Sequence, residues 1–167
     1  MPRVLMLYTG GTIGMRPSPQ GYIPCAGLAE RLAAHLALGD PYRLPAFDVI
    51  EMQPLIDSAE LMPEAWNRLV AALETHWQAY DAFVVLHGTD TMAYSAAALS
   101  FMLGTLNKPV IFTGSQIPLC EPRSDALNNV VSALQLAAHP ATPAKLPWRF
   151  TIGCCVETGL VRCAHKA

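Results

Sequence analysis

Charged side chains are scarce in this sequence: they make up 14% of the 167 residues, and the formal net charge is only −2 at pH 7. Lysine and arginine are scattered without a basic run, which excludes the positively charged face that nucleic-acid binding requires. The five cysteines form no CxxC pair and share no metal-ligand spacing with histidine, so we expect no metal site. No stretch reaches the roughly 18 apolar residues of a membrane span, so we expect no membrane partner.

We expect no signal peptide, because Met1, Pro2 and Arg3 lead directly into an apolar run. Cysteines without a pairing pattern are typical of small buried side chains in a reducing compartment. We therefore expect a cytoplasmic protein.

Hydrophobic residues are abundant, at 52% of the sequence, and this fraction suits a sheet that helices cover on both faces. The length fits one domain, residues 1–167. Apolar runs alternate with helix-like segments, which predicts an α/β fold with an open, mainly parallel sheet of the Rossmann-like, three-layer kind. We expect strands at residues 3–8, 47–52, 82–86, 110–112 and 150–156.

The segments between these runs have the period of amphipathic helices. The segment 91–103 is apolar nearly all round, so we expect it to pack inside, and tryptophans 66 and 77 are expected in the core. The stretch 10–24 is rich in Gly and Pro, with a turn signal at Pro19-Gln20-Gly21, which predicts a hairpin flap. We expect helices at residues 27–38, 64–77, 91–103 and 124–138.

The first four apolar runs end in clusters of Gly, Thr, Ser and Asp. Because the carboxyl ends of parallel strands share one sheet edge, these clusters should converge on one small site. The clusters are Thr9-Gly10-Gly11-Thr12, Asp57-Ser58 beyond Pro54, His87-Gly88-Thr89-Asp90, and Thr113-Gly114-Ser115-Gln116.

Each cluster allows two interpretations. The glycines before Thr12 either form a phosphate cradle or present the Thr12 hydroxyl as a nucleophile. The spacing matches neither of the phosphate-binding patterns GxGxxG and the P-loop, which argues against the cradle. Thr89 and Asp90 cap the following helix or line the site, where the helix N-terminus favours an anion. Asp57 and Ser58 form an ordinary turn or grip the ammonium and carboxylate of an α-amino acid. His87, alone at a strand end, is more often structural than a base, and Gly114 lets a backbone carbonyl face the pocket.

In this order the motifs resemble the two-domain bacterial L-asparaginase family. The motifs are Thr9-Gly10-Gly11-Thr12-Ile13-Gly14, His87-Gly88-Thr89-Asp90-Thr91-Met92 and Thr113-Gly114-Ser115-Gln116. The stretches 86–103, 108–119, 20–24 and 54–58 are similar to the cytoplasmic type I branch, and the resemblance is strongest over residues 1–138. It implies hydrolysis of the side-chain amide of L-asparagine to L-aspartate and ammonia, without a metal or organic cofactor.

The resemblance also implies a role for individual residues. Thr12 corresponds to the nucleophile and Tyr22, on the flap, to the tyrosine that helps activate it. Thr89 corresponds to a second essential threonine, polarised by Asp90 and a lysine. The residues expected to bind the substrate are Gly11, Asp57, Ser58, Gly88, Asp90 and Ser115.

Lys166 has the position expected for that lysine, after the fifth strand, although residues 153–165 depart from the family pattern before it. The sequence ends at Ala167, where family members continue into a second α/β domain, so we expect a truncated chain. The alternative functions are a non-catalytic binder of aspartate or asparagine, and another amidohydrolase of the superfamily, such as a glutaminase. The family resemblance implies a homo-oligomer, a dimer or tetramer.

Overall fold

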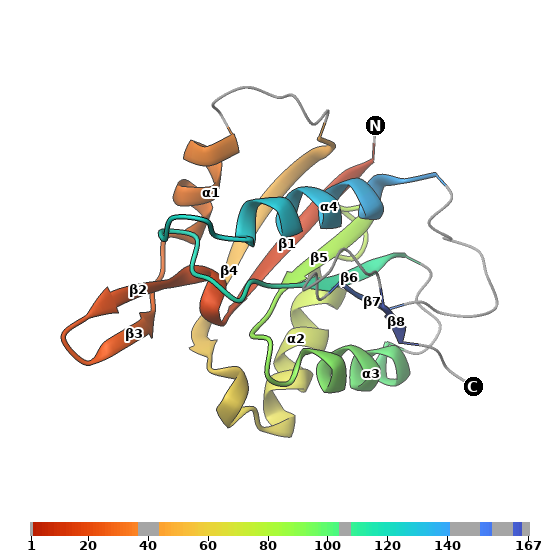
Figure 1. The fold of residues 1–167 in the computed structure, drawn as a ribbon. Helices are drawn as coiled ribbons and strands as arrows, with labels where there is room; N and C mark the ends of the chain where they lie inside the picture. The colour runs from red at the N-terminus through yellow and green to blue at the C-terminus, as the bar shows by residue number, and fades with distance from the viewer. Residues whose placement is uncertain (1, 37–43, 104–107, 141–150, 155–161, 165–167) are drawn as a thin grey trace.

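The fold is taken from a computed structural model, which describes residues 2–36, 44–103 and 108–140, and the backbone of 151–154 and 162–164 (Figure 1). A six-stranded sheet has the order β4-β1-β5-β6-β7-β8. The first five strands are parallel, and β8 runs antiparallel to β7. This confirms the predicted open, mainly parallel sheet flanked by helices. The strands are β1 (Arg3–Gly10), β4 (Ala46–Ile56), β5 (Ala82–Leu86), β6 (Val110–Thr113), β7 (Thr151–Cys154) and β8 (Arg162–Ala164).

Strand β4 is longer than predicted: it continues through Pro54 to Ile56. Pro54 does not end the strand because β4 lies at the edge of the sheet, where a residue without an N–H group is tolerated. The pairing with β1 is irregular near its end, and Gly10 pairs with Ile56. Asp57 therefore follows the strand directly.

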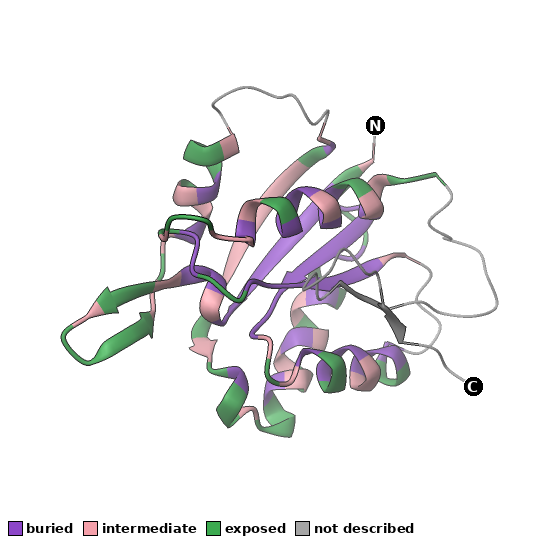
Figure 2. Cartoon of the chain, in the orientation of Figure 1, coloured by how far each residue is buried: buried purple, intermediate pink, exposed green. Residues whose placement is uncertain are grey.

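Helices cover both faces of the sheet: α1 (Leu28–Leu36) and α4 (Ala126–Ala138) lie on one face, and α2 (Pro63–His76) and α3 (Met92–Met102) on the other (Figure 1). The alternation along β1 builds the two cores, since successive strand residues point to opposite faces. Val4 and Met6 pack with α1 and α4, whereas Leu5 and Leu7 pack with α2 and α3. Figure 2 shows this buried centre between more exposed helices.

The expectation that residues 91–103 pack inside is wrong for one side of the helix. Ser95 and Leu99 of α3 are fully buried, but Tyr94 is 70% exposed and Phe101 62% exposed. A helix on the outer face of a sheet buries only one stripe, and here the outward stripe is also apolar. Trp77, directly after α2, lies in the core and stacks on Phe83 with ring centroids 4.8 Å apart, as predicted, whereas Trp66 on α2 is only half-buried against this core.

The predicted flap is a hairpin of β2 (Met15–Ser18) and β3 (Gly21–Pro24), which projects from the body of the fold (Figure 1). Ser18 closes its turn, since its hydroxyl donates to the Gly21 carbonyl at 2.7 Å and accepts from the Gln20 amide at 3.2 Å. None of the described helices has the length and apolar character needed to cross a membrane.

Candidate active site

Three of the four strand-end clusters meet because β4, β1 and β5 are neighbours in the sheet. The Ser58 hydroxyl, after β4, donates to the Asp90 carboxylate, after β5, at 2.9 Å. The Thr91 hydroxyl donates to the Ser58 carbonyl, also at 2.9 Å. Two side-chain contacts thus join segments that are more than 30 residues apart, and the predicted convergence at the carboxyl edge is confirmed for these clusters.

Close backbone approach explains the glycines of the two loops. Gly11 has a φ of 85°, and a Cβ there would lie 2.5 Å from the Gly88 backbone nitrogen. A Cβ on Gly88 would lie 2.5 Å from the Ser58 Cβ and overlap its hydroxyl. Only glycine lets the loops after β1, β4 and β5 pack this tightly.

Thr12 opens a short 3-10 helix, Thr12–Gly14, directly after Gly11 and is half-buried. Thr89 is also half-buried, between Gly88 and the exposed Asp90. Among the described residues, neither threonine hydroxyl has a hydrogen-bond partner. Both hydroxyls are therefore free to meet a ligand at this edge.

The capping interpretation of Thr89 and Asp90 is wrong. Helix α3 begins at Met92 with Thr91 as its N-cap, and no side chain caps it. The Asp90 carboxylate accepts from Ser58 instead, because the loop after β4 brings that hydroxyl within reach. Asp57 does form a local turn, since its carboxylate accepts from the Ala59 amide at 3.0 Å.

The loop after β6 is held by α4. The Asp125 carboxylate accepts from the amides of Gln116 and Ile117, both at 3.0 Å. The Asn129 amide donates to the Gly114 carbonyl at 2.9 Å, so the carbonyl of Gly114 itself is turned toward α4. Ser115 is buried, and its hydroxyl donates to the Ile117 carbonyl at 2.8 Å.

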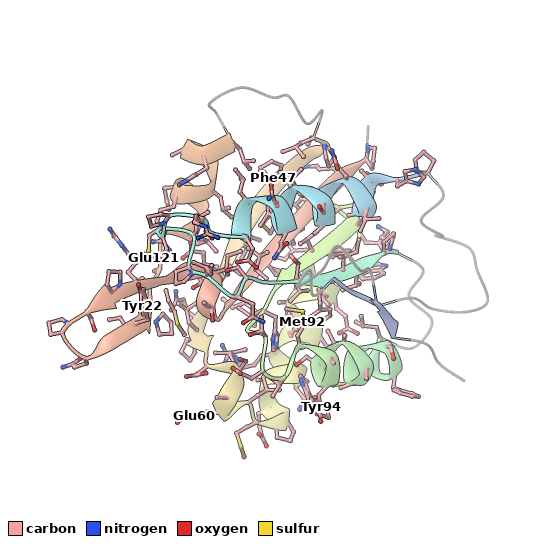
Figure 3. All side chains as sticks on the ribbon, in the orientation of Figure 1. Tyr22, Phe47, Glu60, Met92, Tyr94 and Glu121 are labelled. Carbon is pink, nitrogen blue, oxygen red and sulfur yellow. The ribbon has the colours of Figure 1, made fainter. Side chains whose placement is uncertain are left out.

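Tyr22 lies on the hairpin and is 49% exposed. Its hydroxyl donates to the Glu121 carboxylate at 2.8 Å, and Figure 3 shows the two side chains on neighbouring segments. This hydrogen bond, more than desolvation, raises the pKa of Tyr22 above its usual value. Spacing could not have revealed Glu121, because it lies 99 residues from Tyr22.

His87 is buried at the end of β5, and its ring contacts Ser95 and the Gly88 carbonyl, which favours the structural interpretation. Burial lowers its pKa. Lys166 lies outside the described residues. Within the part of the chain that the structure describes, no group of His, Cys, Asp and Glu side chains could hold a metal ion.

The open, mainly parallel sheet between two layers of helices defines a domain of the three-layer α/β class, and in that class the carboxyl edge, which here carries hydroxyls, carboxylates and glycines, is the usual place for a ligand. A family profile described as asparaginase, N-terminal, matches residues 3–146. The chain belongs to the asparaginase family, and the matched part is the N-terminal one.

Three relatives illustrate this membership. The chain is 51% identical over 136 residues to L-asparaginase 1 of Escherichia coli K12, covering 81% of this chain and 40% of that protein. It is 39% identical to the 60 kDa lysophospholipase of Mus musculus, covering 84% of this chain and 28% of that protein. The crystal structure of L-asparaginase I from Vibrio cholerae superposes with a TM-score of 0.74 at 43% identity, over 81% of this chain and 40% of that chain. The chain thus spans less than half the length of these relatives.

Proposed function

We propose that this chain binds L-asparagine and hydrolyses its side-chain amide to L-aspartate and ammonia, with Thr12 as nucleophile. The observation that carries the proposal is the contact between Ser58 and Asp90, together with the close approach of Gly11 and Gly88, the residues that precede Thr12 and Thr89. Membership of the asparaginase family supports the reaction class. We also propose that residues 1–167 form one domain of a cytoplasmic protein.

The chemistry proceeds in two steps. The Thr12 hydroxyl attacks the amide carbonyl, its proton passes to the amide nitrogen, and the C–N bond breaks to release ammonia and leave an ester on Thr12. Water then attacks this ester, which releases L-aspartate and restores the hydroxyl. A threonine hydroxyl is a weak nucleophile near neutral pH, so a neighbouring group has to take up its proton.

The remaining residues bind and polarise the substrate. The Asp57 and Asp90 carboxylates suit the α-ammonium group. The Ser58 hydroxyl, once its proton turns from the Asp90 carboxylate to the substrate, suits the α-carboxylate, together with the backbone N–H groups at Gly11 and Gly88. Thr89, with Asp90 and Lys166, is proposed to assist the attack on the carbonyl, and the Ser115 backbone to hold the leaving amide. No cofactor takes part in these steps.

Tyr22 is proposed to help activate Thr12, and this role requires the hairpin to bring Tyr22 over the site. Its hydroxyl donates to Glu121, and this hydrogen bond raises the pKa of Tyr22, so the phenolate is harder to form while the bond is in place. The hairpin that carries Tyr22 has few buried residues, which suits a segment that moves over the site when substrate binds (Figure 2).

The test is ammonia release from L-asparagine by the purified chain and by Thr12→Ala. Thr75→Ala is the matched control, because Thr75 lies exposed on α2 with its hydroxyl bonded to the Ala71 carbonyl. We expect release by wild type and Thr75→Ala and background release by Thr12→Ala. Equal release by Thr12→Ala and wild type would refute the assigned nucleophile.

Two alternatives keep the same site. The first alternative is that the domain alone binds aspartate or asparagine without turnover. It is motivated by the length of the chain, which spans 40% of the Escherichia coli relative. Stabilisation by L-aspartate without ammonia release would identify this case. Faster release from L-glutamine than from L-asparagine would instead identify a glutaminase.

We further propose that the chain forms a homo-oligomer, a dimer or tetramer. The exposed apolar side chains of α3, Tyr94, Phe101 and Met102, support this proposal. A monodisperse monomer in light scattering at high concentration would contradict it.

A further inference from the structure

A buried chain of hydrogen bonds links two helices to the loop that carries Thr89. The Trp66 indole on α2 donates to the Ser95 hydroxyl on α3 at 3.0 Å. The Ser95 oxygen lies 3.0 Å from His87 Nε2, and His87 Nδ1 lies 2.8 Å from the Gly88 carbonyl oxygen. Ser95 is fully buried and His87 is 2% exposed, so no water competes for these partners.

The partners determine which ring nitrogen carries the proton. A carbonyl oxygen only accepts, so Nδ1 of His87 must be the protonated nitrogen. The Trp66 indole only donates, so the Ser95 oxygen accepts from it and its own proton is free to point to Nε2. Each donor then has one acceptor if His87 is neutral, with a proton on Nδ1 and a lone pair on Nε2.

The same arrangement makes His87 unsuitable as a base for the reaction. Its lone pair on Nε2 is used by Ser95, on the side of α3, and its ring packs against Phe112 with centroids 5.8 Å apart. The described hydrogen bonds of the ring involve no charged group, and burial lowers the pKa of His87. A proton taken by Nε2 would leave the Ser95 proton without its acceptor.

The Gly88 carbonyl precedes Thr89, and Gly88 packs against Ser58 and Gly11. The peptide nitrogen of His87 is also held, since it donates to the Thr113 carbonyl at 2.8 Å. The orientation of this peptide therefore decides where Thr89 and Asp90 lie relative to Ser58. We propose that His87 is a positioning residue: Trp66 and Ser95 hold it as the Nδ1-protonated tautomer, and it orients the Gly88 peptide and thereby Thr89 and Asp90.

This inference deepens the proposed function, but its first test does not depend on activity. A long-range nitrogen–proton NMR spectrum of the wild-type chain reports which nitrogen of each imidazole is protonated. We expect His87, assigned by its loss in His87→Gln, to be the neutral Nδ1–H tautomer at pH 7. We expect Ser95→Ala to shift the Gly88 and Thr89 amide signals. A proton on Nε2, or unchanged amide signals in Ser95→Ala, would overturn the inference.

Activity measurements on two variants of His87 test its positioning role. The side-chain amide of His87→Asn can place a donor where Nδ1 lies, whereas His87→Gln reaches only toward Ser95. We expect kcat/KM to fall by about 100-fold in His87→Gln, the scale of a displaced catalytic group, and by much less in His87→Asn, with the pH profile unchanged in both. His35→Asn, on the exposed face of α1, is the matched control and should keep wild-type activity.

Equal losses of kcat/KM in His87→Asn and His87→Gln would show that His87 acts only through general packing. Loss of the acid limb of the pH profile would show that His87 acts as a base. Either result would overturn the positioning role. If the wild-type chain releases no ammonia, the proposed function fails, and the L-aspartate affinity of the same variants replaces kcat/KM. If it binds no L-aspartate either, the tautomer and the amide shifts decide the inference alone.

Discussion

Replacing Gly88 by alanine is the sharpest test of how the site is assembled. The new Cβ would lie 2.5 Å from the Ser58 Cβ, overlap the Ser58 hydroxyl, and lie 3.4 Å from the Gly11 Cα. Contacts of this kind need the neighbour to move, and overpacking a tight site costs about 1–3 kcal/mol. The Ser58 side chain has to turn away and lose its hydrogen bond to the Asp90 carboxylate.

A hydrogen bond to a charged group is worth about 1.5–3 kcal/mol, and this one is only partly buried, so we take its lower end. We therefore expect Gly88→Ala to lower the free energy of unfolding by about 2.5–4.5 kcal/mol. The measurement is the midpoint of urea unfolding at an unchanged slope, together with the affinity for L-aspartate. We expect that affinity to be lost, because the Ser58–Asp90 contact forms the proposed ammonium and carboxylate site.

A double-mutant cycle with Ser58→Gly separates this clash from a general effect at Gly88. Ser58→Gly removes the atoms that the new Cβ would meet, so Gly88→Ala should cost little when it is added to Ser58→Gly. Additive costs in the double variant would refute the steric account. Wild-type stability of Gly88→Ala would do the same.

Three further predictions follow from the contacts. Glu121→Gln should lower the pKa of Tyr22 toward its ordinary value, because the carboxylate hydrogen bond raises it, and the phenolate absorbance titration, with Tyr22→Phe as reference, measures this. Asp125→Ala should cost about 1 kcal/mol in urea unfolding, because two exposed loop amides and the Asn129 amide lose a carboxylate acceptor, and Asp125→Asn should cost less; equal costs would contradict this explanation. Burial lowers the pKa of His87 in the folded chain, so as the pH falls the unfolded chain binds this proton before the folded chain does. The free energy of unfolding should therefore fall as the pH drops below about 6.5, the ordinary pKa of histidine, and His87→Asn should make this fall smaller.

The sequence by itself determined the elements and their order. The apolar runs predicted β1, β5 and β6 closely, and the amphipathic stripes predicted α1, α2 and α4, because local periodicity reports which face of an element is buried. The continuously apolar segment 91–103 predicted α3. The glycine and proline signals predicted the hairpin. Parallel strands then placed the hydroxyl and carboxylate clusters at one edge.

Only the tertiary structure decided which of these groups touch. Local propensity allowed Asp90 to cap α3, but the adjacency of β4, β1 and β5 brought Ser58 to it instead. The exposed side of α3, the bond of Tyr22 to Glu121 and the chain from Trp66 to His87 likewise depend on packing between distant segments. Such contacts arise from how the sheet orders its strands and where the helices lie on it. A pattern read along the sequence records the period of each element but not its neighbours.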